Sequence, residues 1–179
     1  MAASPPRVYL GHGASGTAVS MRPYVEALRR RKVEATAIDL PRRGRSVVRA
    51  EAAVPAFLAA IGDPATAVIG GHSYGGRVAS MLAADVAVHG LVLLSYPLHR
   101  PGHPEDLRTE HWPRIHCPVL LLSGDADPFA RIDLLRTAVG LLPSGTLQIY
   151  PGLHHGLTAV ADDAAERIAA FVRSLPHAS

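Results

Sequence analysis

Residues 68–84 read Val-Ile-Gly-Gly-His-Ser-Tyr-Gly-Gly-Arg-Val-Ala-Ser-Met-Leu-Ala-Ala, and this stretch decides the fold. A short apolar run, typical of a buried strand, leads into Gly71-His72-Ser73-Tyr74-Gly75, and a helical pattern follows. This is a Gly-x-Ser-x-Gly pattern in the strand-to-helix setting that presents a serine hydroxyl on a sharp turn. Glycines fit there because side chains would collide with neighbouring backbone. The pattern predicts Ser73 as a nucleophile, and the alternative is a purely structural Gly-rich turn.

The composition is that of a globular chain with one domain, residues 1–179. Its 48% of hydrophobic residues suffices for a full core. The net charge of +3 comes almost entirely from arginine, since Lys32 is the only lysine. No basic face interleaved with aromatic residues indicates nucleic-acid binding, so we expect no nucleic-acid partner.

The cysteine count and the hydropathy of the chain indicate the cellular compartment. Cys117 is the only cysteine, which excludes an internal disulfide. The N-terminal residues lack the apolar region of a signal peptide, and no apolar segment reaches membrane-spanning length. We therefore expect a cytoplasmic protein that does not bind membranes.

Apolar runs alternate with helical patterns along the chain, which predicts a mostly parallel sheet with helices on both faces. Most of the runs are continuously apolar, as expected where both faces of a sheet are buried. The expected strands are Arg7 to Leu10, Val33 to Asp39, Ala67 to Gly70, Gly90 to Ser95, Val119 to Ser123 and Thr146 to Tyr150. The expected helices are Ala18 to Arg31, Glu51 to Ile61, Ser73 to Asp85, Ile132 to Leu141 and Asp162 to Leu175. Asp162 or Asp163 is expected to cap the last helix.

The longest irregular segment runs from Tyr96 to Pro118 and is rich in proline and histidine. A loop of this length is either a functional element such as a lid or a surface crossover stiffened by proline, and both remain open. Histidine side chains beside Cys117 raise the question of a metal site, but their spacings match no zinc signature. We expect a solvated loop and no metal, although this segment contains His99, His103, His111 and His116.

Two later turns supply candidate partners for the serine. A serine nucleophile needs a base that accepts its proton and an acid that orients the base. The turn of residues 124–128 carries Asp125 and Asp127, and the turn of residues 151–156 carries His154 and His155. Both follow expected strands, so they lie at the carboxyl edge of the sheet, where ligands bind in open α/β folds. For Asp127 the alternative is a helix cap ahead of a proline.

Seven short motifs between about residues 8 and 157 match one known family. They are Gly11-His12-Gly13-Ala14-Ser15-Gly16, Asp39-Leu40-Pro41, Gly44-Arg45-Ser46, Gly71-His72-Ser73-Tyr74-Gly75-Gly76-Arg77, Ser95-Tyr96-Pro97-Leu98-His99, Gly124-x-x-Asp127-Pro128-Phe129 and His155-Gly156. With them the chain resembles the α/β-hydrolases, and more narrowly the small, capless group of dienelactone-hydrolase-like proteins and the testis-expressed-30 and KANSL3-like branch. The resemblance implies a minimal α/β-hydrolase fold with about six mostly parallel strands flanked by helices, without a cap domain.

The same resemblance assigns roles to single residues. It implies Ser73 as nucleophile, Asp127 as acid and His155 as base. The Gly-x-x-Asp spacing selects Asp127 over Asp125, and a position directly before glycine selects His155 over His154.

An oxyanion hole needs two backbone N–H groups aimed at the developing negative charge. The expected donors are Tyr74, directly after the nucleophile, and Ala14, in the loop after the first strand. The alternative for Gly11-x-Gly13-x-x-Gly16 is a dinucleotide-binding fingerprint, with Asp39 standing about 23 residues on. That alternative gives no role to the serine turn or to the late histidines.

We therefore expect a serine hydrolase of the carboxylic-ester-hydrolase type, which cleaves a small ester, thioester or lactone through an acyl-enzyme without a cofactor. The alternative is a non-catalytic hydrolase-fold scaffold or interaction module. Arg42, Arg43 and His99 are candidate substrate-binding residues; for the arginines, which can pair with a substrate carboxylate, the alternative is a solvated loop. Without a cap the pocket is shallow, which favours short acyl groups. The sequence leaves open which ester is the natural substrate and whether the chain forms a homodimer.

Overall fold

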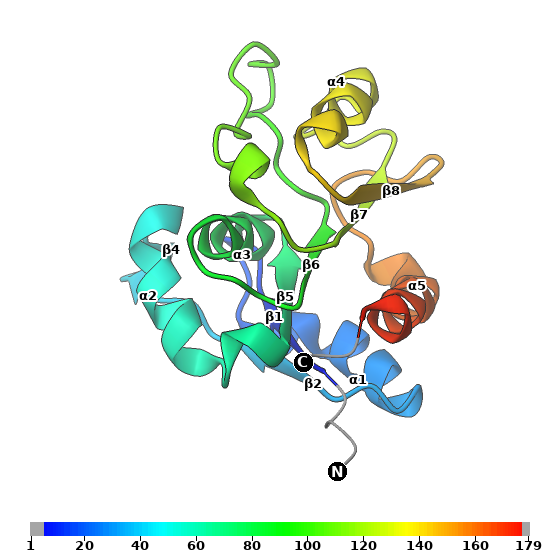
Figure 1. Ribbon diagram of the computed structural model, residues 1–179. Helices are drawn as coiled ribbons and strands as arrows, with labels where there is room; N and C mark the ends of the chain where they lie inside the picture. Colours follow the sequence, from blue (N-terminus) through cyan, green and yellow to red (C-terminus); the bar gives the residue numbers. More distant parts are fainter. Residues whose placement is uncertain (1–5, 177–179) are drawn as a thin grey trace.

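Six strands form one parallel sheet in the computed structural model, which describes residues 6–176 (Figure 1). The order across the sheet is β2-β1-β5-β6-β7-β8, and each neighbouring pair is parallel. The strands are β1 (Arg7–Gly11), β2 (Ala35–Ile38), β5 (Ala67–His72), β6 (Gly90–Leu94), β7 (Val119–Gly124) and β8 (Gly145–Tyr150). The fold predicted from the sequence is confirmed, with the expected strands shifted at their ends by one or two residues.

Among the described residues, five α-helices cover this sheet, and short 3-10 turns extend three of them or stand alone. The α-helices are α1 (Arg22–Arg30), α2 (Ala50–Ala60), α3 (Tyr74–Asp85), α4 (Ile132–Ala138) and α5 (Ala161–Ser174). The 3-10 turns are η1 (Ala18–Met21), η2 (Pro64–Thr66), η3 (Trp112–Arg114), η4 (Val139–Leu141) and η5 (Thr158–Val160). The expected helix from Ala18 to Arg31 is thus divided into η1 and α1, with a proline in the first turn of α1, where its missing N–H costs nothing.

A small antiparallel ribbon is among the elements that the sequence did not predict. β3 (Arg42–Arg43) and β4 (Ser46–Val47) form a two-stranded antiparallel ribbon between β2 and α2. Gly44, in its turn, has φ +62°, a conformation that favours glycine. Strands of two residues are too short for any periodicity to show in the sequence.

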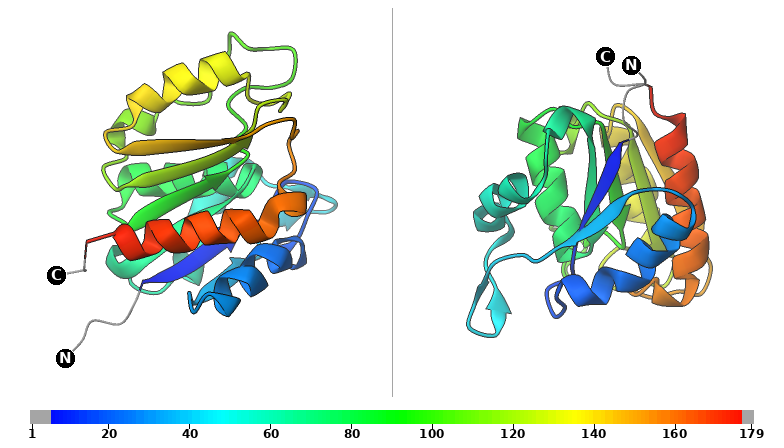
Figure 2. Two further views of the ribbon diagram at one scale, coloured as in Figure 1. Left: turned by 90° about the vertical axis from the view of Figure 1, so that its right-hand side faces the viewer. Right: turned by 90° about the horizontal axis from the view of Figure 1, so that it is seen from below.

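The sheet separates two apolar cores, because alternate side chains of each strand point to opposite faces. Leu91 and Leu93 join the core beneath α2 and α3, while Val92 and Leu94 join the core beneath α1 and α5. Figure 2 shows these two pairs of helices on opposite sides of the sheet. Both faces are therefore buried, as the continuously apolar strands indicated.

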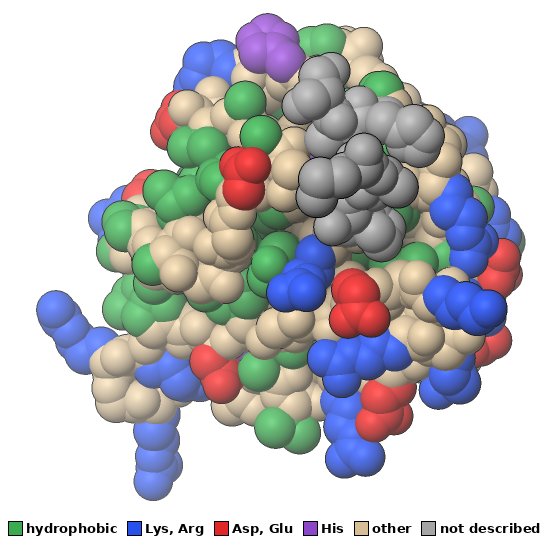
Figure 3. Space-filling model, turned by 60° about the horizontal axis from the view of Figure 1, so that its bottom comes forward, with side chains coloured by type: hydrophobic (Ala, Val, Ile, Leu, Met, Phe, Trp, Pro, Cys, Tyr) green, Lys and Arg blue, Asp and Glu red, His purple; other side chains and the backbone are tan. Residues whose placement is uncertain are grey.

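The start of α5 differs from the expectation. Neither Asp162 nor Asp163 caps the helix, whose N-cap position is Val160. Asp162 instead pairs with Arg31 of α1 at 2.8 Å, and Asp163 accepts a hydrogen bond from the Tyr150 hydroxyl at 2.7 Å. On the face drawn in Figure 3, basic and acidic side chains accordingly stand beside one another. Exposed pairs of this kind contribute little stability, typically about 0–1 kcal/mol each.

The segment from Tyr96 to Pro118 connects β6 to β7 and is anchored in the core at both ends. Tyr96 and Trp112 are buried, and their rings pack edge to face with centroids 5.0 Å apart. The Tyr96 hydroxyl donates to the Arg108 carbonyl at 2.6 Å. The middle of the segment, residues 100–106, is mostly exposed and projects from the end of the molecule at the top of Figure 1. Four later residues of the segment are exposed as well: Glu110, Pro113, Arg114 and His116. These contacts favour a crossover rather than a lid. The crossover is not confined to the surface, because its buried aromatic residues belong to the core.

Candidate active site

Ser73 stands on a strained turn between β5 and α3. Its φ of 50° and ψ of −113° lie outside the regions that non-glycine residues ordinarily adopt. The neighbouring glycines explain how the turn is accommodated. A Cβ on Gly71 or on Gly75 would overlap the backbone of Gly11 at the end of β1. The turn at Ser73 packs against β1 so closely that only glycine fits at these two positions, as expected from the sequence.

His155 links Ser73 to Asp127. Its Nε2 lies 2.8 Å from Ser73 Oγ, and its Nδ1 lies 2.8 Å from Asp127 Oδ2. A carboxylate only accepts hydrogen bonds, so Nδ1 carries the proton of the neutral ring and Nε2 is free to accept from the serine hydroxyl. The Phe129 ring packs on the imidazole, with centroids 4.2 Å apart.

The Asp127 side chain is fully buried, with no exposed surface. Its Oδ1 also accepts the Phe129 N–H at 2.8 Å, which fixes the carboxylate relative to the loop after β7. α4 begins only at Ile132 and its N-cap position is Arg131, so Asp127 does not cap that helix. The Asp127 carboxylate is therefore positioned to accept a hydrogen bond from the His155 imidazole.

The two neighbouring candidates lie elsewhere. Asp125 is exposed, and its Oδ1 accepts the Gly152 N–H at 2.7 Å, which ties together the turns after β7 and β8. His154 is exposed. The structure thus brings Ser73, His155 and Asp127 together and leaves Asp125 and His154 outside.

Tyr74 and Ala14 lie in positions that suit backbone donors. Tyr74 is the first residue of α3, and the N–H groups of a first helical turn have no partner within the helix. Ala14 is exposed in the loop after β1. A Cβ on Gly13 would come within 2.9 Å of His72 Nδ1, so this loop abuts the residue that precedes Ser73.

The same loop is held by residues that follow β2. His12 Nε2 accepts the Leu40 N–H at 3.0 Å, and Asp39 Oδ1 accepts the Ala18 N–H at 2.7 Å. Asp39, the residue that fits a dinucleotide fingerprint, is thus engaged with the loop itself.

Arg42 has a different position from the one expected. Its guanidinium donates to the carbonyls of Gly16 at 2.8 Å, Arg45 at 2.6 Å and Ala14 at 3.4 Å. A guanidinium fixed on three carbonyls supports the loop and is not free to pair with a substrate carboxylate. Arg43 is exposed on β3.

His99 is the second correction among the candidate substrate-binding residues. It is buried, its Nδ1 donates to the Arg100 carbonyl at 2.9 Å, and its Nε2 accepts the Arg131 N–H at 3.0 Å. Both ring nitrogens are used inside the protein, so His99 does not present a polar group to a substrate.

His72 is a neighbour of the site that sequence reasoning missed. Its Nε2 donates to the His155 carbonyl at 2.9 Å, and burial lowers the pKa of its imidazole. The variable position of a Gly-x-Ser-x-Gly pattern carries no sequence signal for such a contact. His72 therefore holds the backbone of His155 in place through a contact visible only in the fold.

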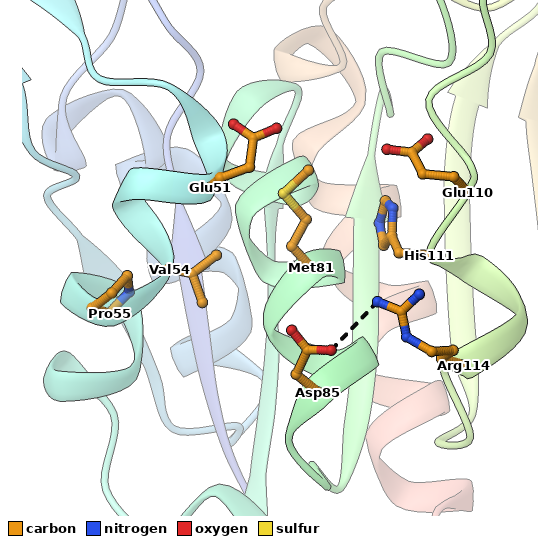
Figure 4. A pocket seen from close by; sticks show the side chains of 8 residues that line it. All are labelled: Glu51, Val54, Pro55, Met81, Asp85, Glu110, His111 and Arg114. Atoms are coloured by element: carbon orange, nitrogen blue, oxygen red, sulfur yellow. Dashed lines mark hydrogen bonds and ion pairs between the residues drawn. The ribbon is translucent and has the colours of Figure 1, made fainter.

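One cavity that borders described side chains lies away from Ser73. It measures about 370 Å³ and is bordered by α2, α3 and the residues around η3. Figure 4 shows the Asp85–Arg114 ion pair at one end and Glu51 and Glu110 at the other. His111 lines it with a neutral ring, because burial lowers the pKa of that imidazole to about 4.

Within residues 6–176, no three His, Cys, Asp or Glu side chains converge as metal ligands would. None of the helices described there is long and apolar enough to cross a membrane.

Comparison with known proteins places this geometry in context. A family model for an alpha/beta hydrolase domain matches residues 7–171. A monoacylglycerol lipase of Paleococcus ferrophilus has a similar structure, with a TM-score of 0.78, 18% identity and coverage of 93% of each chain. The Pyrococcus furiosus esterase Pf2001 has a TM-score of 0.78 at 17% identity, over 96% of this chain and 82% of that one. A predicted CIB-like hydrolase of Thermoplasma acidophilum has a TM-score of 0.75 at 20% identity, over 98% and 90%. At these identities the likeness shows the fold.

Proposed function

The chain belongs to the alpha/beta hydrolase domain family, and on that premise we propose that it is a serine hydrolase of a small ester, thioester or lactone. Esterase and lipase structures among its neighbours support a hydrolase. The observation that carries the proposal is the continuous line of hydrogen bonds from Asp127 through His155 to Ser73. Within the family, residues 71–77 and Ser95 to His99 resemble the dienelactone-hydrolase-like proteins and the testis-expressed-30 and KANSL3-like branch, and we propose membership of that group.

The geometry supports a double-displacement reaction. Ser73 Oγ attacks the substrate carbonyl carbon while His155 Nε2 takes the hydroxyl proton. The tetrahedral intermediate collapses when its bond to the leaving oxygen or sulfur breaks, and His155 gives the proton to that leaving group. Water then attacks the Ser73 ester in the same way, releases the acid and restores the serine.

The negative charge of the tetrahedral oxygen needs donors that are already oriented. The N–H groups of Tyr74 and Ala14 fill this role, one at the first turn of α3 and one in the loop that Arg42 holds. The positive end of the α3 dipole adds to the stabilisation of charge at Ser73.

A fluorophosphonate probe and p-nitrophenyl acetate test the proposal. We expect the wild-type protein to be labelled and to hydrolyse the ester. Ser73→Ala abolishes labelling and lowers kcat by roughly 10⁴ to 10⁶. Ser144→Ala is the matched control, because that serine is exposed at the opposite end of the sheet. A folded wild-type protein that is neither labelled nor active contradicts the proposal and favours the non-catalytic scaffold.

A further inference from the structure

Phe129 is an aromatic residue that packs in neither of the two apolar cores of the described chain. It lies in the loop after β7 and is partly exposed. Its ring lies on the His155 imidazole, with centroids 4.2 Å apart and 30° between the ring planes. Rings this close and this nearly parallel are stacked, because rings lying side by side in one plane would have more distant centroids. Core packing therefore does not explain why a phenyl ring stands at this position.

The backbone of Phe129 has a separate role. Its N–H donates to Asp127 Oδ1 at 2.8 Å, and its carbonyl accepts the His99 N–H at 3.0 Å. Both contacts use main-chain atoms, so any residue except proline could make them. The contact with the imidazole is the one that requires this side chain, and it can be tested without disturbing the two backbone hydrogen bonds.

The edges of the imidazole are already engaged. Nδ1 faces Asp127 and Nε2 faces Ser73, each at 2.8 Å. The His155 side chain is only 23% exposed, so water reaches a small part of it. On its other flank lies the His72 ring, tilted by 54° with centroids 5.3 Å apart, and burial lowers the pKa of that imidazole, so it is neutral. Phe129 is thus the aromatic group that covers a face of the base.

The charge of His155 changes during the proposed reaction. The ring is neutral when it accepts the proton of Ser73 or of the attacking water, and it is an imidazolium once the proton has moved. The face of a phenyl ring carries negative potential and attracts a cation within about 6 Å of its centroid. The stack is therefore more favourable for the imidazolium than for the neutral ring. Only an interaction that is stronger in the transition state than in the ground state raises kcat.

We propose that Phe129 is a positioning residue that acts through His155. Its ring holds the imidazole in line with Ser73 and stabilises the imidazolium that forms in both halves of the reaction. This role rests on the proposed serine-hydrolase function and adds to it a residue outside the Ser73, His155 and Asp127 set. A partly exposed cation–π contact is worth about fivefold in rate, which corresponds to about 1 kcal/mol.

Graded fluorination of the Phe129 ring tests the electrostatic part of the proposal. Fluorine withdraws electron density from the ring face and changes the size of the side chain little. The 4-fluoro, 3,5-difluoro and pentafluoro analogues are incorporated at position 129, and the hydrolysis of p-nitrophenyl acetate is measured. We expect kcat to fall in that order, by about fivefold for the pentafluoro protein. The same series at Phe171 is the matched control, because this partly buried ring packs at the start of β6, at the opposite end of the sheet. There we expect no graded loss.

Two ordinary substitutions test the role of the aromatic face. Phe129→Leu keeps an apolar side chain and both backbone hydrogen bonds but has no aromatic face. We expect kcat and kcat/KM to fall by the same factor of about five with KM unchanged, the pattern of an interaction made only in the transition state. Phe129→Tyr keeps the aromatic face and is expected to stay within about twofold of the wild-type protein. Circular dichroism establishes that each protein is folded.

The outcomes separate this role from the proposed function. An active wild-type protein whose kcat does not change along the fluorinated series, or a Phe129→Leu protein as active as Phe129→Tyr, overturns the role of Phe129 and leaves the serine hydrolase standing. A rise in KM with unchanged kcat in Phe129→Leu also overturns it, since the ring would then contact the substrate. A folded wild-type protein that is neither labelled by the fluorophosphonate nor active overturns both.

Discussion

Replacing Asp127 by Asn removes one negative charge from the site without changing the size of the side chain. The fully buried carboxylate accepts hydrogen bonds from His155 Nδ1 at 2.8 Å and from the Phe129 N–H at 2.8 Å. An asparagine accepts only through its single oxygen. Its amide nitrogen must therefore face one of these two donors.

The favoured orientation keeps the oxygen on the Phe129 N–H, because two buried N–H groups would otherwise face each other at a cost of about 1–3 kcal/mol. The amide then donates to His155 Nδ1, and the ring proton moves to Nε2. In that tautomer Nε2 donates to Ser73 Oγ and no longer accepts from it. We expect kcat to fall by about 10⁴, the loss that the same wrong tautomer causes in a serine protease.

The assay is steady-state hydrolysis of p-nitrophenyl acetate, with circular dichroism to establish that each variant is folded. Asp125→Asn is the matched control. It lies two residues away, it is exposed, and an Asn oxygen can still accept the Gly152 N–H. Its activity is expected to stay within about twofold, as for surface substitutions. A folded Asp127→Asn protein with more than about a tenth of wild-type activity would refute the reasoning.

Gly75→Ala places a methyl group into the backbone at the end of β1, so urea denaturation should show a loss of about 3 kcal/mol or more, whereas Gly140→Ala, which meets open space, should be near neutral. Arg42→Lys lowers kcat more than it raises KM, because an ammonium cannot span the three loop carbonyls; Arg43→Lys leaves both unchanged, and the reverse ranking would reject this role. His111 has a pKa lowered to about 4 by burial, so the unfolded chain takes up its proton first. Stability present above pH 6.5 therefore falls by up to about 3 kcal/mol as the pH approaches 4, and His111→Gln flattens this dependence.

The sequence was sufficient to predict the strands, their parallel arrangement and the residues that meet at Ser73, for a physical reason. Parallel strands with continuously apolar sequences end at one edge, so turns that follow them must be neighbours. Ser73 follows β5, Asp127 follows β7 and His155 follows β8, and these strands lie within four adjacent positions of the sheet. The choice of Asp127 over Asp125 needed the family spacing, because both stand in the same turn.

Contacts between distant segments could not be predicted. Whether a guanidinium points to solvent or to carbonyls depends on where another loop lies, and Arg42 meets carbonyls 26 residues away in sequence. Asp162 was expected to cap its own helix but pairs with Arg31 of α1 across 131 residues. Local patterns report periodicity and turn chemistry, whereas these partners are chosen by the packing of the whole chain.

The β6–β7 crossover shows how such long-range contacts shape the site. It leaves the sheet between the strands that lead to Ser73 and to Asp127. The His99 N–H donates to the Phe129 carbonyl, and the His99 ring accepts the Arg131 N–H, so one residue fastens the loop that follows Asp127. Trp112, fully buried beside Tyr96, anchors the other end. The prolines limit the conformations of the segment, and the buried aromatic residues fix its position. A histidine that the sequence suggested for substrate binding thus acts one layer behind the site, where it holds the acid in register with the base.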